Sequence, residues 1–237
     1  MDLPGLAELF NAVGGRFVTP VEELARKAGQ CRAIVFDWDG VFNAGRKGHA
    51  SASGFAEADS MGTNMLRYGL WSNLGRLPLA VIISGENNQS AIGFATREHF
   101  DAAYTGMRDK KQVIEHVCDR HELRPEQIAC IFDDINDLPM AEVCGLRFRV
   151  RRDASPLFAA MADDSGFCDY VTGAESGGFA VREICELMLG LMDVYTDVVE
   201  SRLAYDARYR DYFNARQSAE TLLYGQEGAA IVCRNAG

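Results

Sequence analysis

Residues 32–40 read RAIVFDWDG, an apolar run that ends in two aspartates and a glycine. Its first five residues are mostly β-branched or aromatic, which predicts a strand. Asp37 and Asp39 follow where this strand ends, so both carboxylates reach the space beyond the sheet edge, and Gly40 allows a sharp turn. Two close carboxylates repel each other, and a hard divalent cation, most plausibly Mg²⁺, relieves the repulsion. Taken alone, D-x-D-G also fits an ordinary acidic turn.

The same alternation of apolar run and helix continues along the chain. LAVII at 79–83 and IACIF at 128–132 read as buried strands, while 60–74 and 109–121 read as helices with one apolar face. Short strands that are apolar throughout and alternate with helices are typical of a mostly parallel sheet covered on both faces. The sequence therefore predicts an α/β fold with ligands bound outside the carboxyl ends of the strands.

Two stretches interrupt this alternation. Residues 43–58 are rich in Gly, Ala and Ser, which suggests a flap or β-hairpin beside the end of the first strand. Residues 178–224 read as one or two long helices with no strand after them, and their aromatic side chains at helical spacing are expected to pack within the chain or between subunits. We expect an N-terminal helical extension at 1–30, a catalytic domain at 31–192 and a helical tail at 193–237.

A second acidic cluster follows the strand at 128–132. Asp133, Asp134, Asn136 and Asp137 come directly after it. Asn136 or Asp134 could instead cap the next helix, but capping would use one of these groups rather than all four. Two acidic strand ends in one sheet converge readily on one cation, so the two clusters together predict a metal site.

Candidate phosphate-binding residues lie between the two acidic clusters. Ser84 and Gly85 follow the strand at 79–83, and a hydroxyl with backbone N–H groups at a helix start can cradle a phosphate, although a plain serine cap fits as well. Lys110 opens the next predicted helix, where its charge opposes the helix dipole. A phosphate and nearby carboxylates explain that position better than helix stability does, whereas Lys111 fits a solvated lysine.

Composition narrows the function classes. The formal net charge of −10 argues against nucleic acid as the main partner, because the basic clusters at 108–111 and 147–152 are short and fit a solvated face. No apolar run approaches the ~20 residues needed to cross a bilayer, and no secretory signal opens the chain. The seven cysteines never form C-x-x-C and lie mostly in apolar runs, so we expect free thiols in a cytoplasmic protein.

The ordered motifs D-x-D-G, S-G, Lys and D-D-x-x-D resemble the four motifs of the haloacid dehalogenase (HAD) superfamily of phosphohydrolases, over roughly residues 32–192. The runs at 59–62 (DSMG), 133–139 (DDINDLP) and 177–183 (GGFAVRE) are similar to the branch that dephosphorylates 3-deoxy-octulosonate 8-phosphate and ketodeoxynononate or sialic acid 9-phosphates. The resemblance implies a HAD-like Rossmannoid three-layer sandwich with a β-hairpin flap and a sugar-phosphate phosphatase domain at 31–192.

The resemblance also implies roles for the acidic residues. Asp37 would attack phosphorus and become an aspartyl phosphate. Asp39 would protonate the leaving sugar oxygen and then take a proton from the hydrolytic water. The Asp37 carboxylate, the Asp39 carbonyl and Asp133 would hold Mg²⁺, with Asp134 in support.

The remaining motif residues would hold the phosphoryl group. Ser84, the Gly85 N–H and Lys110 would bind its oxygens, and Asp137 would orient Lys110. Phosphoryl transfer needs little beyond in-line positioning and charge neutralisation, so this set is chemically coherent.

Three positions depart from the family pattern. Glu86 stands where the octulosonate 8-phosphate enzymes usually carry arginine, and the nine-carbon members often carry glutamate there, which favours a nine-carbon acid sugar phosphate. A carboxylate at this position would repel a substrate carboxylate but could accept hydrogen bonds from sugar hydroxyls. Phe132 replaces the usual glycine before the acidic cluster and could crowd the loop, and Phe179 lies in a loop that often bears a charge.

The spacing between the motifs leaves no room for a separate cap domain, and an uncapped site is open to water. Capless relatives form tetramers in which a neighbouring subunit covers the site. We therefore expect a homotetramer with the flap at 43–58 and the segment at 175–182 on the shared edge.

Other functions stay open. One is a phosphotransferase or a phosphatase of another small phosphomonoester; another is a non-catalytic member whose long C-terminal helices bind a partner. The intact Asp37, Asp39, Lys110 and Asp133 favour catalysis. A dinucleotide-binding fold is excluded because no G-x-G-x-x-G follows the first strand.

Overall fold

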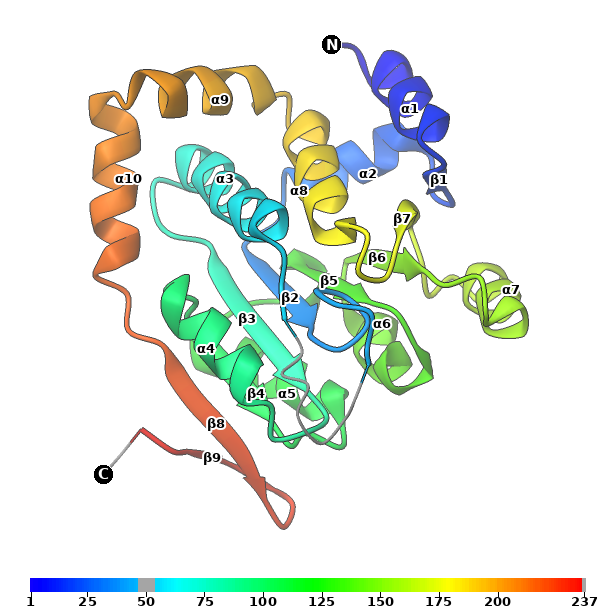
Figure 1. Ribbon diagram of the computed structural model, residues 1–237, viewed down its shortest axis with the longest axis vertical. Coiled ribbons are helices and arrows are strands. Elements are labelled where there is room, and N and C mark those ends of the chain that lie inside the picture. Colours follow the sequence, from blue (N-terminus) through cyan, green and yellow to red (C-terminus); the bar gives the residue numbers. More distant parts are fainter. Residues whose placement is uncertain (47–53, 236–237) are drawn as a thin grey trace.

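The computed structural model describes residues 1–46 and 54–235, which form ten α-helices around one nine-stranded sheet (Figure 1). The strands are β1 (Arg16–Phe17), β2 (Ala33–Asp37), β3 (Leu79–Ser84), β4 (Ala102–Thr105), β5 (Ile128–Phe132), β6 (Leu146–Arg151), β7 (Tyr170–Glu175), β8 (Leu222–Glu227) and β9 (Ala230–Cys233). The α-helices are α1 (Leu3–Ala12), α2 (Val21–Ala28), α3 (Glu57–Leu74), α4 (Gln89–Arg97), α5 (Lys110–His121), α6 (Leu138–Val143), α7 (Pro156–Asp164), α8 (Ala180–Leu191), α9 (Tyr195–Ala204) and α10 (Ala207–Gln217). Two 3₁₀ turns, Pro125–Gln127 and Ile135–Asp137, complete the secondary structure of the described part.

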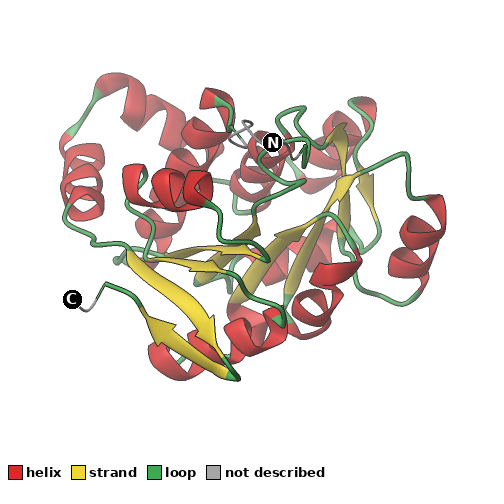
Figure 2. Cartoon of the chain, turned by 60° about the horizontal axis from the view of Figure 1, so that its bottom comes forward, coloured by secondary structure: helices red, strands yellow, loops and turns green. Residues whose placement is uncertain are grey.

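The strand order is β1-β7-β6-β5-β2-β3-β4-β8-β9. All neighbours from β7 to β8 pair in parallel, and the edge strands β1 and β9 pair antiparallel (Figure 2). Because the strands between β7 and β8 run in the same direction, their carboxyl ends lie along one edge of the sheet. The chain leaves β2 on one side toward β3 and returns on its other side as β5, and such a switch point is where ligands bind in this class of fold. The prediction of a mostly parallel α/β fold is confirmed.

The apolar strands are buried on both faces. In β2, Ile34 and Phe36 join a core that includes side chains of α3, α4 and α8, while Ala33 and Val35 join a second core with α5, α6 and α7. This split follows from the period-two alternation of side chains along a strand. The two cores fix β2 from both faces, so the loop after it starts from a rigid position.

In the described part of the chain, no further domain covers the carboxyl edge of the sheet. Within the described ranges, β2 is followed by a loop and α3, and β3 leads through α4 to β4. Seven of the sixteen residues of the flap expected at 43–58, residues 47–53, lie outside the described residues.

The C-terminal region differs from the prediction. Residues 180–217 form α8, α9 and α10 rather than one or two long helices, and two strands follow. β8 pairs in parallel with β4, and β9 pairs with β8 as a hairpin. The expectation that 193–237 is helical is therefore wrong for β8 and β9, because the unpaired edge of β4 gives a late segment the partner it needs to form a strand.

Helix α2 lies within the N-terminal segment that was expected to be helical, and no side chain caps its start. The Thr19 hydroxyl donates to Asp169 at 2.7 Å, while Pro20 occupies the capping position. Asp169 is fully buried and also accepts from Lys27 and Arg147. A buried carboxylate therefore outcompetes the helix end for the hydroxyl.

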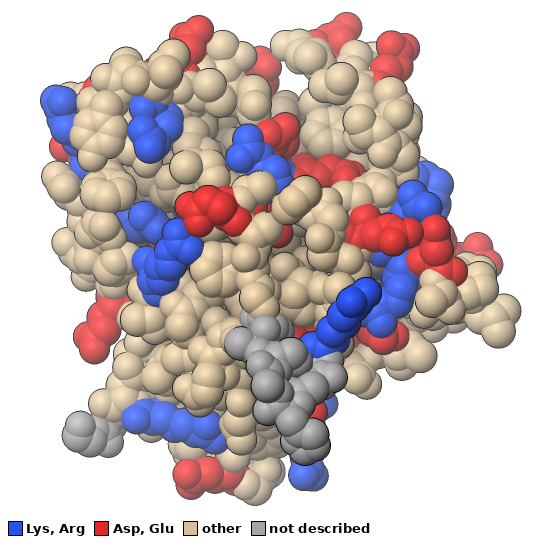
Figure 3. Space-filling model, viewed as in Figure 1, with Lys and Arg blue, Asp and Glu red and all other residues tan. Residues whose placement is uncertain are grey.

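The surface carries both signs of charge. On the face shown in Figure 3, basic and acidic side chains are interspersed among uncharged ones. In the described ranges, no helix is both long enough and apolar enough to cross a bilayer.

Candidate active site

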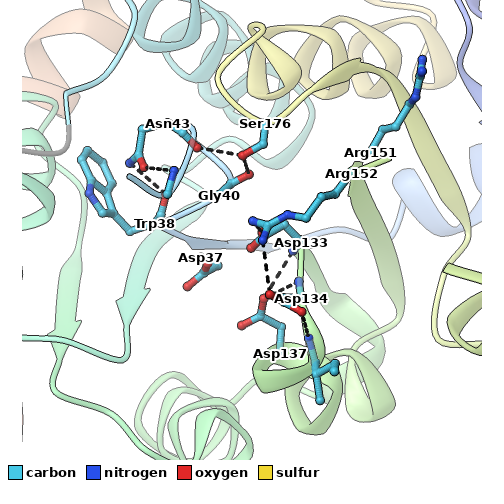
Figure 4. Close-up of polar contacts among 12 residues, drawn as sticks. Asp37, Trp38, Gly40, Asn43, Asp133, Asp134, Asp137, Arg151, Arg152 and Ser176 are labelled. Carbon is cyan, nitrogen blue, oxygen red and sulfur yellow. Dashed lines mark hydrogen bonds and ion pairs between the residues drawn. The ribbon is translucent and has the colours of Figure 1, made fainter. Parts of the chain in front are cut away.

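The two predicted acidic clusters meet at the carboxyl edge of the sheet. Asp37 ends β2, Asp133 follows β5, and carboxylate oxygens of Asp37, Asp133 and Asp137 lie within 4.8 Å of one another (Figure 4). All three side chains are buried. Three carboxylates at this spacing are oxygen ligands of the type that Mg²⁺ prefers, so the donor set fits a hard divalent cation.

Glycine at position 40 lets the loop after β2 lie close to the carboxylate of Asp133. Its φ is +95°, a left-handed conformation that favours glycine, and a Cβ at this position would overlap the carboxylate of Asp133. The loop is held on its other side by the Ser176 hydroxyl, which donates to the carbonyls of Gly40 at 2.7 Å and Asn43 at 2.9 Å. The segment after β7 therefore fixes the loop that carries the first acidic motif.

Lys110 supplies a positive charge inside the acidic cluster. Its Nζ donates to Asp37 Oδ1 at 2.5 Å and to Asp137 Oδ1, and its side chain is 6% exposed. Asp109 caps α5 by accepting from the Lys111 N–H at 3.0 Å, so Lys110 is the first helical residue. This places the ammonium between the carboxylates that follow β2 and β5.

The ionisation of the cluster reflects its burial. Desolvation and the charge of Asp137 raise the pKa of Asp37 to about 7, against the opposing effect of Lys110. Burial, together with Asp37 and Asp137, raises the pKa of Asp133 to about 8, although Arg152 lowers it. Burial alone would lower the pKa of Lys110, but Asp37 and Asp137 outweigh it and raise that pKa. Asp37 and Asp133 are therefore held in a site that favours added positive charge.

Asp134 and Asp137 shape the second acidic loop. Asp134 accepts from the Ile135 N–H at 2.8 Å and caps the 3₁₀ turn, whereas neither Asp134 nor Asn136 caps helix α6, whose capping position is held by Asp137 without a side-chain bond. Asp137 Oδ2 accepts from the backbone N–H groups of Asp133 and Asp134, both at 3.3 Å, while its Oδ1 accepts from Lys110. Asp137 thus joins the loop to the lysine.

The other candidate residues surround a pocket of about 370 Å³ next to the cluster. Asp39 is half-buried in its wall and accepts from Asn88 Nδ2 at 3.4 Å. Gly85 and Glu86 are exposed and line the same pocket. Ser84 is 1% exposed and lies behind the wall, where its hydroxyl accepts from the Glu86 N–H at 3.3 Å. The pocket thus brings together residues from all four motifs, with Ser84 set back.

Sequence reasoning missed Arg152. Its guanidinium is bonded to Asp133 and lies 3.4 Å from Asp134 Oδ2, and the side chain lines the pocket (Figure 4). The basic run at 147–152 was interpreted as a solvated face, but it spans β6, whose carboxyl end meets the same sheet edge as β5. A basic residue directly after a predicted parallel strand was the available signal.

The two phenylalanine departures lie away from the pocket. Phe132 is fully buried in the second core, so the expected crowding of the loop does not arise through its side chain. Phe179 is 53% exposed with a φ of +68°, in the left-handed region that bulky residues avoid. It lines a separate, larger cleft of about 840 Å³ between α1, α8 and the start of α9. Because that cleft includes none of the acidic motif residues, the smaller pocket is the candidate active site.

Comparison with known proteins gives a consistent result. No protein-family model matches the chain. The chain is 29% identical over 167 residues to the 3-deoxy-D-manno-octulosonate 8-phosphate phosphatase KdsC of Salmonella typhi, covering 69% of this chain and 81% of that protein. Its fold resembles the structure of the phosphatase of the same name from Yersinia pestis, with a TM-score of 0.61, 28% identity and coverage of 73% and 89%.

A second structural relative carries the superfamily name. A protein from Legionella pneumophila, assigned to the HAD superfamily (subfamily III A) as a hydrolase, matches with a TM-score of 0.64 and 26% identity, covering 77% of this chain and 94% of that protein. Fold, motif order and relatives agree: the chain is a phosphoric monoester hydrolase that resembles the HAD superfamily and is similar to 3-deoxy-D-manno-octulosonate 8-phosphate phosphatase.

Proposed function

We propose that the protein hydrolyses an acidic eight- or nine-carbon keto-sugar phosphate in a Mg²⁺-dependent reaction through an aspartyl-phosphate intermediate, with the nine-carbon substrate favoured. The observation that carries the proposal is the meeting of Asp37, Asp133 and Asp137 with Lys110 at the carboxyl edge of the sheet. Hydrolysis of a sugar phosphate by this type of enzyme is supported by the KdsC relatives.

Asp37 is the proposed nucleophile. Its carboxylate attacks phosphorus, the bond from phosphorus to the sugar oxygen breaks, and an acyl phosphate forms on Asp37. Lys110, bonded to Asp37 Oδ1, places positive charge where the negative charge of the phosphoryl group accumulates. The Gly85 N–H lies in the pocket wall and is proposed to bind a second phosphoryl oxygen, with Ser84 setting the loop behind it.

Asp39 is the proposed acid and base. It lies in the wall of the pocket, half-buried, two residues after the nucleophile. It donates a proton to the leaving sugar oxygen and then accepts one from the water that hydrolyses the acyl phosphate.

The metal is proposed to be Mg²⁺, held by the Asp37 carboxylate, the Asp39 carbonyl and Asp133, with Asp134 in support. When bound, the ion supplies positive charge to the transferring phosphoryl group. The raised pKa values of Asp37 and Asp133 support the proposal, because both carboxylates gain most from a cation placed between them.

The proposal is tested by phosphate release from eight- and nine-carbon acid sugar phosphates and from hexose phosphates, with Mg²⁺ and with a chelator. We expect the acid sugar phosphates to be preferred and the activity to disappear with the chelator and return with Mg²⁺. A flat, weak profile over all substrates would leave only the reaction type.

The nucleophile is tested by Asp37→Asn. The variant should lose turnover completely while its melting temperature is kept, because asparagine still accepts from Lys110 and removes one of several crowded charges. The control is Asp153→Asn, since Asp153 is exposed and paired with Arg151 outside the pocket. Undiminished phosphate release by Asp37→Asn would refute the nucleophile assignment.

We also propose that the enzyme works as a homotetramer in which a neighbouring subunit covers the pocket. The support is the uncovered carboxyl edge in the described ranges, together with the contact of Ser176 with the loop at 40–43, which joins the two segments expected at the shared edge. Light scattering should give the mass of four chains, and an active monomer would contradict the proposal.

A further inference from the structure

Among the described residues, three basic side chains line the active-site pocket: Arg108, Lys110 and Arg152. Lys110 is bonded to Asp37 and Asp137, and Arg152 is bonded to carboxylates of the second acidic loop. Within residues 1–46 and 54–235, the guanidinium of Arg108 has no ion pair and no hydrogen bond. Arg108 is therefore the pocket cation whose charge is available to a ligand.

The backbone that carries Arg108 is firmly held. Three consecutive N–H groups each have an acceptor: Gly106 donates to the Glu86 carbonyl at 3.0 Å, and Met107 donates to the Ser84 carbonyl at 3.1 Å. The N–H of Arg108 itself donates to Gln226 Oε1 at 3.2 Å. Gln226 lies in β8, which runs beside β4 and brings this side chain to the carboxyl edge of the sheet. Arg108 thus projects from a loop whose conformation these hydrogen bonds hold before any ligand binds.

A second contact joins the same hairpin to the loop after β3. Arg234, which follows β9, donates to Asn87 Oδ1 at 3.3 Å. Asn87 follows Glu86, and the hairpin therefore contacts both loops that form this side of the pocket. The C-terminal strands support the wall of the pocket in addition to closing the sheet edge.

The pocket is strongly acidic, so an arginine without an ion-pair partner in it indicates where an anionic group of the substrate could bind. Six carboxylates line it: Asp37, Asp39, Glu86, Asp133, Asp134 and Asp137. A substrate that carries an anionic group besides its phosphate is repelled by this wall unless a cation receives that group. Glu86 cannot do so, whereas a guanidinium binds a carboxylate through two parallel hydrogen bonds.

We infer that Arg108 is a specificity-determining residue that binds a carboxylate of the sugar phosphate, and that Gln226 is the positioning residue that holds it over the pocket. This inference rests on the proposed function and extends it by assigning the residue that distinguishes an acidic substrate from a neutral one.

The test compares Arg108→Ala with the matched control Lys111→Ala, whose side chain pairs with exposed Glu142 and does not line the pocket. For 3-deoxy-octulosonate 8-phosphate or its nine-carbon counterpart, KM of Arg108→Ala should rise about tenfold or more with kcat nearly unchanged, since a charged hydrogen-bonded pair is lost. For a neutral hexose 6-phosphate, kcat/KM should change less than about twofold, as it should for both substrates in the control.

Rescue variants separate charge from geometry. Arg108→Lys keeps the charge but not the two parallel hydrogen bonds, so it should recover part of the lost KM. Gln226→Ala should raise KM for the acidic substrate in the same direction by a smaller factor, with kcat nearly unchanged, because the Arg108 N–H loses its acceptor. Melting temperatures of all variants verify that the sheet edge is intact.

The outcomes separate this inference from the proposed function. Equal losses of kcat/KM for acidic and neutral substrates in Arg108→Ala would overturn the inference, as would an unchanged KM for both. In either case phosphate release by the unaltered enzyme would leave the proposed function in place. Absence of phosphate release from every phosphomonoester by the unaltered enzyme would overturn both.

Discussion

The guanidinium of Arg152 is bonded to the carboxylate of Asp133, a member of the three-carboxylate cluster. Asp133 is 2% exposed and Arg152 is 30% exposed, so the pair connects a buried anion to a partly solvated cation. Arg152 therefore neutralises a carboxylate that a metal ion would also neutralise. At the proposed metal site, the two cations would therefore compete for the same group.

We expect Arg152→Gln to have two opposite effects. Without metal, the free energy of unfolding should fall, because the buried Asp133 loses its ion-pair partner. The decrease should be only about 1–2 kcal/mol, because water already screens part of the charge of Arg152. Metal should bind several-fold more tightly, because a competing positive charge is removed. Chemical denaturation and titration calorimetry with Mg²⁺ measure the two effects.

The control for this experiment is the neighbouring residue. Arg151 pairs with exposed Asp153 outside the pocket, so Arg151→Gln should leave metal affinity unchanged. Weaker metal binding by Arg152→Gln would show that the arginine orients Asp133 rather than competing for it.

Asp39→Asn should separate chemistry from metal binding. Turnover should fall by at least about 100-fold because asparagine cannot donate and accept the proton, which is the usual scale for loss of a general acid or base. Metal affinity should be retained, since the backbone carbonyl assigned to the metal is unchanged. Steady-state kinetics and titration calorimetry give the two values, and simultaneous loss of both would contradict the division of roles within this residue.

Gly40→Ala should disrupt the cluster through a single added carbon. The Cβ would overlap the Asp133 carboxylate, and the φ of +95° adds backbone strain. We expect metal binding and activity to be lost. Gly75→Ala is the matched control, because Gly75 has a φ of +68° but no described atom within 4 Å of the added Cβ. It should cost about 1 kcal/mol of stability from strain alone and leave activity unchanged.

Asp59 should make stability depend on pH. It is 1% exposed, and burial raises its pKa to about 6, while the Arg182 N–H that it accepts at 2.9 Å and the charge of Arg182 lower it. Because the folded-state pKa lies above the ordinary value of 3.8, the folded protein binds this proton more tightly than the unfolded chain. The carboxyl group therefore favours folding at low pH, and that contribution is lost as the pH rises from about 4 to about 6.

Asp59→Asn removes this dependence. Asparagine still accepts from the Arg182 N–H but carries no buried charge, so at pH 7 the variant should be more stable than the unaltered protein by up to about 3 kcal/mol, and by only about 1 kcal/mol at pH 4.5. Urea unfolding at both pH values measures the difference, with exposed Glu57→Gln as the control. A stability gain of equal size at both pH values would contradict the assignment to this carboxyl group.

The parts of the fold that the sequence predicted are those with a local pattern. The apolar runs that became β2, β3 and β5 are buried on both faces, so nearly every side chain in them is apolar. Asp37 and Asp133 could be placed at one edge because parallel strands end on the same side. The apolar pattern of the strands, together with the rule that parallel strands end at the same edge, was sufficient to predict that Asp37 and Asp133 lie together.

The parts that the sequence did not predict depend on contacts between distant residues. β8 follows a helical region, and its strand conformation depends on the free edge of β4, 120 residues earlier by the pairing of Ala102 with Leu222. Arg152 resembles any surface arginine until the order of β5 and β6 places it beside Asp133. The sequence indicates that Gly40 lies in a turn, but it does not reveal that Gly40 lies against Asp133. A local sequence pattern does not show which atoms of distant segments come into contact.

The pairing of β8 with β4 has a consequence for how the enzyme matures during synthesis. The strands β2 to β5 leave the ribosome early, yet Gln226, which accepts from the Arg108 N–H, is made long after them. A growing chain can assemble its acidic cluster before it has the support for the pocket wall. If Arg108 selects the substrate, as inferred above, a chain in which β8 has not yet paired with β4 would hold its acidic cluster but lack the contact that positions the selecting residue.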